Sequence, residues 1–174
     1  MRPEPAACGP AEPWSIHRCE RRPIACLYQF DLQEIAMSFT TADALEIVAA
    51  AQIEAATLGV SVTCCVFSAD ARELATVRMD GAGWFTPDIA RSKATSAATM
   101  GSDSGDLAKL IDRHPELNDL IGDQLPVPFT TLAGAVAVRS DGVVIGAVGV
   151  SGATSEQDVT IARAAVAAWT AARS

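Results

Sequence analysis

The sequence has few basic residues, few aromatic residues and no long hydrophobic run, and each shortage excludes a class of protein. It carries 13 Lys and Arg against 21 Asp and Glu, a formal net charge of −8. That balance argues against a nucleic-acid partner, because phosphate binding needs a concentrated basic surface. No apolar run approaches the roughly 20 residues that a membrane-spanning helix needs, so we expect no membrane segment. Apolar residues make up 49% and aromatic residues only 5%, which predicts a globular core of small side chains.

Several common catalytic and cofactor motifs are also missing. The sequence contains no G-x-x-x-x-G-K-S/T, no G-x-G-x-x-G after a predicted strand, no C-x-x-C and no H-E-x-x-H. From Met37 onward it has one histidine, His114, so a single chain cannot build a multi-histidine metal site. Ser151 lacks the full G-x-S-x-G pattern and has no evident base, which disfavours a serine hydrolase.

The first 36 residues differ in character from the rest. They hold five of the nine prolines and three of the five cysteines, without helical or strand periodicity. We interpret residues 1–36 as a disordered tail or an over-extended reading frame ahead of a start at Met37, and residues 37–174 as one domain. Only Cys64 and Cys65 then remain. They are neighbours in a predicted strand, so we expect their side chains on opposite faces, no disulfide framework and a cytoplasmic location.

The domain alternates helical and strand patterns. We predict helices over 41–58, 86–99, 106–113 and 155–171, and strands over 60–68, 73–78, 132–139 and 143–150. Thr40 begins the first helix, Leu45 and Val48 are expected on its buried face, and Ile47, Ala51 and Ala55 widen that face. Asp141-Gly142 between two apolar runs predicts a hairpin. The order α-β-β-α-α-β-β-α predicts an α+β domain with an antiparallel sheet and packed helices.

Charged residues gather where the second strand leads into the next helix. Arg78 and Asp80 lie in the connecting segment, and Asp88 and Lys93 lie on the helix. Lys93 falls on an alanine-rich stripe, so it either extends outwards to solvent or points into a cavity where it can meet an anion. A structural ion pair of Lys93 or Arg78 with Asp80 or Asp88 explains the same pattern, and on residue physics alone that explanation is favoured.

A glycine-rich turn precedes the last helix. Backbone N–H groups around Ser151 and Gly152 could bind a carboxylate or a propionate. Ordinary capping by Thr154, Gln157 and Asp158 explains every residue of the turn except Ser151.

His114 is the one candidate nitrogen ligand in the domain for haem or a metal. It precedes Pro115 in the most acidic segment of the chain, and we expect His114-Pro115 to interrupt the helix there. A solvated loop histidine explains it better, so His114 is a weak metal candidate.

Several of these stretches carry a family resemblance when they are taken together. They are Arg78-Met79-Asp80-Gly81, residues 88–98 with Asp88, Arg91 and Lys93, residues 141–152, and Glu156-Gln157-Asp158. With the opening helix, they resemble the GlcG/HbpS-like haem-binding family over residues 37–169. The chain departs from the family pattern at 134–137, which reads Gly-Ala-Val-Ala where Gly-Gly-x-Pro is common.

The resemblance implies a profilin-like fold and a homo-oligomer, from a dimer up to an octamer. It implies haem or a small anion as the ligand of an accessory protein, with haem, iron or oxidative-stress responses as settings. The ligand contacts would then be Arg78, Asp80, Asp88, Lys93, Ser151 and Gly152. Haem degradation is not carried over, because it needs a redox mechanism that these residues do not display.

Two other functions remain open. One is an enzyme or auxiliary protein of small organic acid or aromatic catabolism that uses the same pocket. In it, Asp80 or Asp88 would be the acid–base group and Lys93 the electrostatic stabiliser. The other is an inert oligomeric scaffold in which these charges form interface ion pairs.

Overall fold

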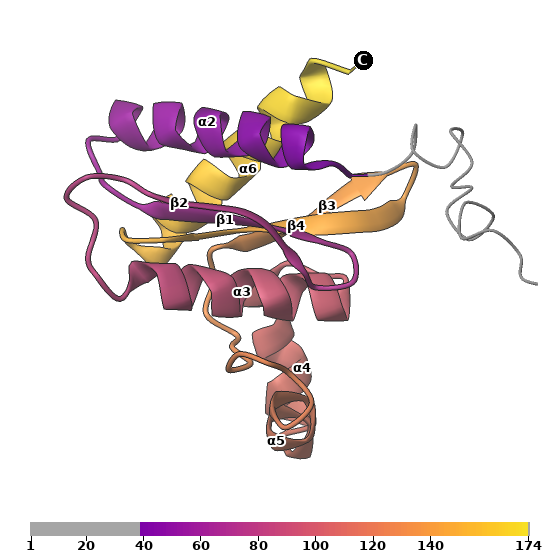
Figure 1. The fold of residues 1–174 in the computed structure, drawn as a ribbon. Helices are drawn as coiled ribbons and strands as arrows, with labels where there is room; N and C mark the ends of the chain where they lie inside the picture. The colour runs from indigo at the N-terminus through magenta and orange to yellow at the C-terminus, as the bar shows by residue number, and fades with distance from the viewer. Residues whose placement is uncertain (1–38, 174) are drawn as a thin grey trace, which may run out of the picture. The chain divides into compact units, whose positions relative to one another are not determined.

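The computed structural model describes residues 39–173 (Figure 1). The interpretation of residues 1–36 therefore lies outside the described residues. Within the described part, no helix is long and apolar enough to cross a membrane.

The centre of the fold is one antiparallel sheet with the strand order β2-β1-β4-β3. Its strands are β1 (Thr63–Ser68), β2 (Glu73–Arg78), β3 (Ala135–Ser140) and β4 (Val143–Ser151). Two hairpins are thus joined through the β1–β4 pair, in which Cys65 lies opposite Gly149 and Thr63 opposite Ser151. The predicted α+β class and the Asp141-Gly142 hairpin are confirmed.

Helices cover both faces of this sheet (Figure 1). Helices α2 (Thr41–Thr57) and α6 (Ser155–Ala171) pack on one face, and α3 (Thr86–Met100) packs on the other. Alternation along β1 supplies both cores, because Cys64 joins the cluster under α2 and α6 while Cys65 joins the cluster under α3. The expected opposite orientation of the two cysteines is confirmed.

Helix α3 approaches the sheet closely because small residues meet at the contact. Its buried side includes Ala90, Ala94 and Ala97. Opposite them lies Gly149 of β4, where an added Cβ would collide with the Ala90 carbonyl oxygen. This packing fixes the backbone of α3 against β4, and it carries the Lys93 side chain into the interior.

The buried face of α2 differs from the prediction. Val48 is buried as expected, but Leu45 is 54% exposed. Ile47 and Ala51 are buried as expected, and the face is completed by Asp43, which the prediction did not include. Asp43 accepts a hydrogen bond from the indole of Trp169 on α6, and this contact is satisfied only when that face of α2 points inward.

The acidic segment contains more helix than predicted. A short 3-10 turn, η2 (Ser104–Asp106), leads into α4 (Leu107–Arg113), and α5 (Glu116–Gly122) follows at once. The expected end of helical structure at Pro115 is therefore wrong. The proline instead occupies the N-cap of α5, where its missing N–H is not needed.

Strand β3 begins three residues later than predicted. The Ser104 hydroxyl donates to the Leu132 carbonyl at 2.7 Å and accepts from the Ala135 N–H at 3.0 Å. Gly134 between them has a φ of +132°. The Ser104 hydroxyl therefore bonds Leu132 and Ala135 in place of a neighbouring strand, although the Gly134 carbonyl still accepts from the Val150 N–H at 2.8 Å. The chain turns beside Lys93 before the strand starts.

Candidate functional site

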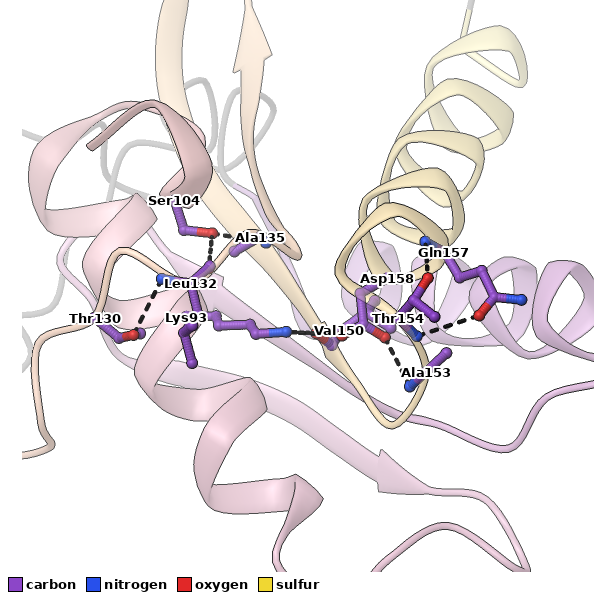
Figure 2. A network of polar contacts seen from close by, with 10 residues as sticks. All are labelled: Lys93, Ser104, Thr130, Leu132, Ala135, Val150, Ala153, Thr154, Gln157 and Asp158. Atoms are coloured by element: carbon purple, nitrogen blue, oxygen red, sulfur yellow. Dashed lines mark hydrogen bonds and ion pairs between the residues drawn. The ribbon is translucent and has the colours of Figure 1, made fainter. Parts of the chain in front are cut away.

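Lys93 points into the protein rather than outwards. The residue is 3% exposed, and its Nζ donates to Asp158 Oδ2 at 2.7 Å and to the Val150 carbonyl at 3.0 Å (Figure 2). Of the two expected placements, extension to solvent is wrong. The expected ion-pair partners, Asp80 and Asp88, are also wrong for Lys93, because its partner is Asp158.

Asp158 completes the pair from the first turn of α6. Its Oδ1 accepts from the Ala153 N–H at 3.1 Å, while its Oδ2 faces Lys93. Burial raises the pKa of the Asp158 carboxyl above its ordinary value, and the hydrogen bonds from Lys93 and Ala153 oppose this shift without cancelling it. From the sequence, Asp158 is predicted only as a capping residue, because no local pattern links it to a lysine on another helix.

A cleft of about 300 Å³ opens beside this ion pair, and we call it the lysine cleft. Its polar lining includes Lys93, Ser151 and Asp158, and its apolar lining includes Phe85, Ile89 and Leu132. The cleft thus combines a cation and a hydroxyl with a short apolar wall.

Ser151 and Gly152 lie together at the end of β4 and line the lysine cleft. Ser151 is 5% exposed, and its hydroxyl has no hydrogen-bond partner among residues 39–173. Gly152 has a φ of +143°, and an added Cβ would lie 2.6 Å from the Ser61 carbonyl oxygen. The capping box between Thr154 and Gln157 is confirmed, so capping accounts for that part of the turn and leaves the Ser151 hydroxyl unused.

A second cleft, of about 560 Å³, lies between α3 and the segment 126–130, and we call it the proline-loop cleft. Its walls include Ile89, Val127 and Phe129, and Ile89 also lines the lysine cleft. The larger cleft is therefore mainly apolar.

Arg91 and Asp88 are the charged residues of the proline-loop cleft. Arg91 Nε donates to Glu73 Oε2 at 2.8 Å, and its Nη1 donates to Asp88 Oδ1 at 3.2 Å. The Glu73 carboxylate raises the pKa of the Arg91 guanidinium. These bonds hold Arg91 in place and leave other N–H groups of its fork unused.

The remaining candidates lie apart from both clefts. Arg78 is exposed and donates to the Ala82 carbonyl at 2.8 Å, and Asp80 is exposed as well. His114 caps the end of α4 in solvent, with its Nδ1 3.5 Å from Glu116 Oε1. Within the described part of the chain, no group of three or more His, Cys, Asp or Glu residues could hold a metal ion.

The structure therefore divides the six predicted contacts. Lys93, Ser151 and Gly152 lie together in the lysine cleft. Asp88 lies in the proline-loop cleft, and Arg78 and Asp80 line neither of the two clefts. The acidic group beside Lys93 is Asp158, which lies 65 positions away in the sequence. Spacing and motif could not have revealed that contact.

Comparisons with known proteins agree with this fold. Residues 39–167 match the family model described as haem degrading protein HbpS-like. The corrinoid adenosyltransferase PduO of Salmonella typhimurium is 32% identical over 134 residues, which are 77% of this chain and 39% of PduO. The chain spans less than half the length of the curated relatives it matches.

Two solved structures show the same similarity in three dimensions. A double mutant of Streptomyces reticuli HbpS has a TM-score of 0.68 at 27% identity, covering 94% of this chain and 98% of that one. A complex of PduOC with haem has a TM-score of 0.67 at 28% identity, covering 75% of this chain and 94% of PduOC. The family match covers more than half of the sequence, and the chain therefore belongs to the HbpS-like family.

Proposed function

We propose that this chain is a haem-binding accessory protein and that the proline-loop cleft receives the porphyrin. The observation that carries the proposal is an apolar cleft of about 560 Å³ with the Arg91 guanidinium in its lining. Haem is a flat apolar ring with two carboxylates, and this combination suits it. Membership of the HbpS-like family and the haem complex of the related PduOC support the same proposal.

The residues of the cleft fit the ring and a propionate. Ile89, Val127 and Phe129 offer apolar contact, and the unused N–H groups of Arg91 offer a charge-assisted hydrogen bond. No histidine, cysteine or methionine of the described chain lines either cleft. Haem, when bound, would supply a redox-active iron, while this chain's own residues would hold the ring and one propionate.

A haemin titration followed in the Soret region tests the proposal. We expect a saturable shift with a defined stoichiometry. Arg91→Gln should weaken haemin binding about tenfold, because the contact with a propionate is lost. Phe129→Ala should also weaken it, because the apolar contact of the phenyl ring with the porphyrin is lost. Arg163→Gln, which removes an exposed arginine from α6, is the matched control.

Each alternative result has a definite meaning for the haem proposal. The absence of a saturable shift would contradict haem binding. Unchanged affinity in both cleft variants would contradict the placement in the proline-loop cleft. A loss confined to His114→Ala would make that exposed histidine the iron ligand instead.

A second candidate function is binding of a small organic anion in the lysine cleft, as an enzyme or auxiliary protein of organic acid or aromatic catabolism would require. The unused hydroxyl of Ser151 beside Lys93 favours it. A thermal-shift screen of small carboxylates tests this candidate, because a ligand bound to the folded state raises the melting temperature. The absence of any shift at saturating concentrations would contradict it.

We also propose a homo-oligomer in the cytoplasm. Ile53 is 70% exposed and Leu45 is 54% exposed on the outer side of α2, which supports a subunit contact there. The two cysteines of the described chain are both free, which supports a reducing compartment. Light scattering of the wild type and of Ile53→Lys tests the contact, and an unchanged mass in the variant would contradict it.

A further inference from the structure

We infer that the lysine cleft binds a small monocarboxylate together with one proton. The inference rests on the second candidate function and adds to it the class of ligand and the coupling to pH. It depends on three features of the cleft, which are its unused donors, its charge and its size.

The lysine cleft contains hydrogen-bond donors that no group of the described residues uses. A lysine ammonium has three N–H groups, and those of Lys93 have two acceptors, Asp158 Oδ2 and the Val150 carbonyl. The Ser151 hydroxyl, also in the cleft lining, has no partner among the described residues. Ser155, at the first position of the 17-residue helix α6, lines the same cleft. A carboxylate in the cleft would therefore meet a cation, a hydroxyl and a helix N-terminus.

The charge of the cleft sets the proton requirement. Lys93 and Asp158 form a neutral pair, and each side chain is 4% exposed. A bound carboxylate adds a second negative charge to the same poorly solvated space, so the two carboxyl groups share one ammonium. One carboxyl group must then hold a proton, which moves from solvent to an Oδ atom of Asp158. Once Asp158 is neutral, the Lys93 ammonium can pair with the carboxylate of the ligand.

The charged surroundings single out Asp158 as the group that takes the proton. Lys93 and Asp158 are the charged residues in the lining of this cleft. The other atoms bonded to the pair are the backbone groups of Val150 and Ala153. Arg91 lies in the neighbouring cleft and is paired with Glu73. Burial already raises the pKa of the Asp158 carboxyl, so the free protein is poised for this uptake.

The size of the cleft limits the body of the ligand. A volume of about 300 Å³ with Phe85, Ile89 and Leu132 in its lining suits a carboxylate on a small apolar or aromatic body. A dianion would bring a further negative charge, and among the described residues Lys93 is the one basic side chain in the lining to balance it. We therefore expect monocarboxylates to bind more tightly than dicarboxylates or phosphate.

Benzoate is a suitable probe, with benzamide as its uncharged counterpart. Calorimetric titration at one pH in two buffers of different protonation heat counts the protons exchanged. We expect uptake of about one proton per benzoate, and an affinity that falls about tenfold per pH unit above the pKa of Asp158. Benzamide should bind at least about tenfold more weakly, because it brings no charge to Lys93.

Asp158→Asn provides the decisive variant, because asparagine imitates the protonated carboxyl in size and keeps an acceptor for the Ala153 N–H. Its benzoate affinity should be independent of pH, without proton uptake. Lys93→Met should lose binding. Ser151→Ala should weaken binding about fivefold without altering the proton count, since Ser151 does not titrate.

The outcomes separate this inference from the function on which it rests. Benzoate binding with no proton uptake in the wild type would overturn the coupling and leave anion binding in place, and this result requires no variant to fold. The absence of any benzoate heat or thermal shift would overturn both. Equal binding of benzamide would overturn recognition of the carboxylate.

Discussion

Lys93 Nζ lies 2.7 Å from Asp158 Oδ2, and the pair joins α3 to α6 across the end of strand β4 (Figure 2). Burial of two charges costs desolvation energy, which their mutual attraction and further hydrogen bonds offset. The Val150 carbonyl and the Ala153 N–H provide those hydrogen bonds. The pair is therefore a structural contact and also the polar wall of the lysine cleft.

Removal of one partner should destabilise the fold strongly. Lys93→Met leaves a buried carboxylate without its cation, and we expect a loss of about 3 kcal/mol in the free energy of unfolding. The double variant Lys93→Met/Asp158→Asn should recover part of that loss, because no buried charge remains. Urea unfolding followed by circular dichroism measures both. Arg163→Met, which breaks an exposed pair with Asp103, should change stability by less than about 1 kcal/mol.

Gly134 leaves room for the Lys93 ammonium because it has no Cβ. An added Cβ would lie 2.5 Å from Lys93 Nζ and 2.8 Å from the Val150 carbonyl oxygen, at a φ of +132°. Gly142 has a φ of +80° with nothing within 4 Å, so Gly142→Ala reports backbone strain alone. We expect Gly134→Ala to lower the melting temperature more than Gly142→Ala and to weaken carboxylate binding. Equal losses would contradict a crowded Lys93.

The Asp43 carboxylate should make the free energy of unfolding depend on pH in the acid range. Burial would raise the pKa of its carboxyl, but hydrogen bonds from Thr40 and Trp169 and the charge of Arg173 outweigh burial and lower the pKa to about 2. Because the folded pKa lies below the unfolded value, the contribution is complete above about pH 4 and is lost as the pH falls toward 2. It amounts to about 2 kcal/mol.

Asp43→Asn should therefore lose stability at neutral pH and show a flatter dependence on acid. Urea midpoints measured from neutral pH down to about pH 2 test this. Glu46→Gln removes the exposed carboxylate that also pairs with Arg173, and it serves as the control. An acid dependence in Asp43→Asn equal to that of the wild type would contradict the assignment.

The two core cysteines should be unreactive in the folded protein. Burial raises the pKa of the Cys65 thiol to about 12 and also raises that of Cys64. In a variant with Cys8→Ser, Cys19→Ser and Cys26→Ser, a thiol reagent at mildly alkaline pH should label the native protein only at the rate of unfolding. Labelling should become fast in urea. Fast labelling without denaturant would contradict their burial.

Local signals predicted most of the fold. The Thr40 cap, the Asp141-Gly142 turn and the Thr154 capping box each depend on residues a few positions apart, and each is confirmed. The helix α5 was missed because Pro115 was interpreted as an interruption, although a proline is tolerated where a helix begins.

The site was less accessible to sequence reasoning because its contacts are distant in the chain. Lys93 stood out as a charge on an apolar stripe, and that contrast correctly indicated an inward side chain. Its partner Asp158 resembled any acidic residue at a helix start. The proline-loop cleft brings residues 88–92 of α3 against a segment that begins more than 30 positions later in the sequence, and no periodicity marks Phe129 as a wall.

We propose that two ligand chemistries are divided between the two neighbouring clefts, haem in the proline-loop cleft and a small carboxylate in the lysine cleft. Parallel titrations of haemin and benzoate into the wild type, Arg91→Gln and Lys93→Met test it most directly. We predict that Arg91→Gln weakens haemin and leaves benzoate unchanged, while Lys93→Met abolishes benzoate binding and leaves haemin unchanged. Loss of both ligands in both variants, with the circular dichroism spectrum retained, would contradict the division and indicate one shared site.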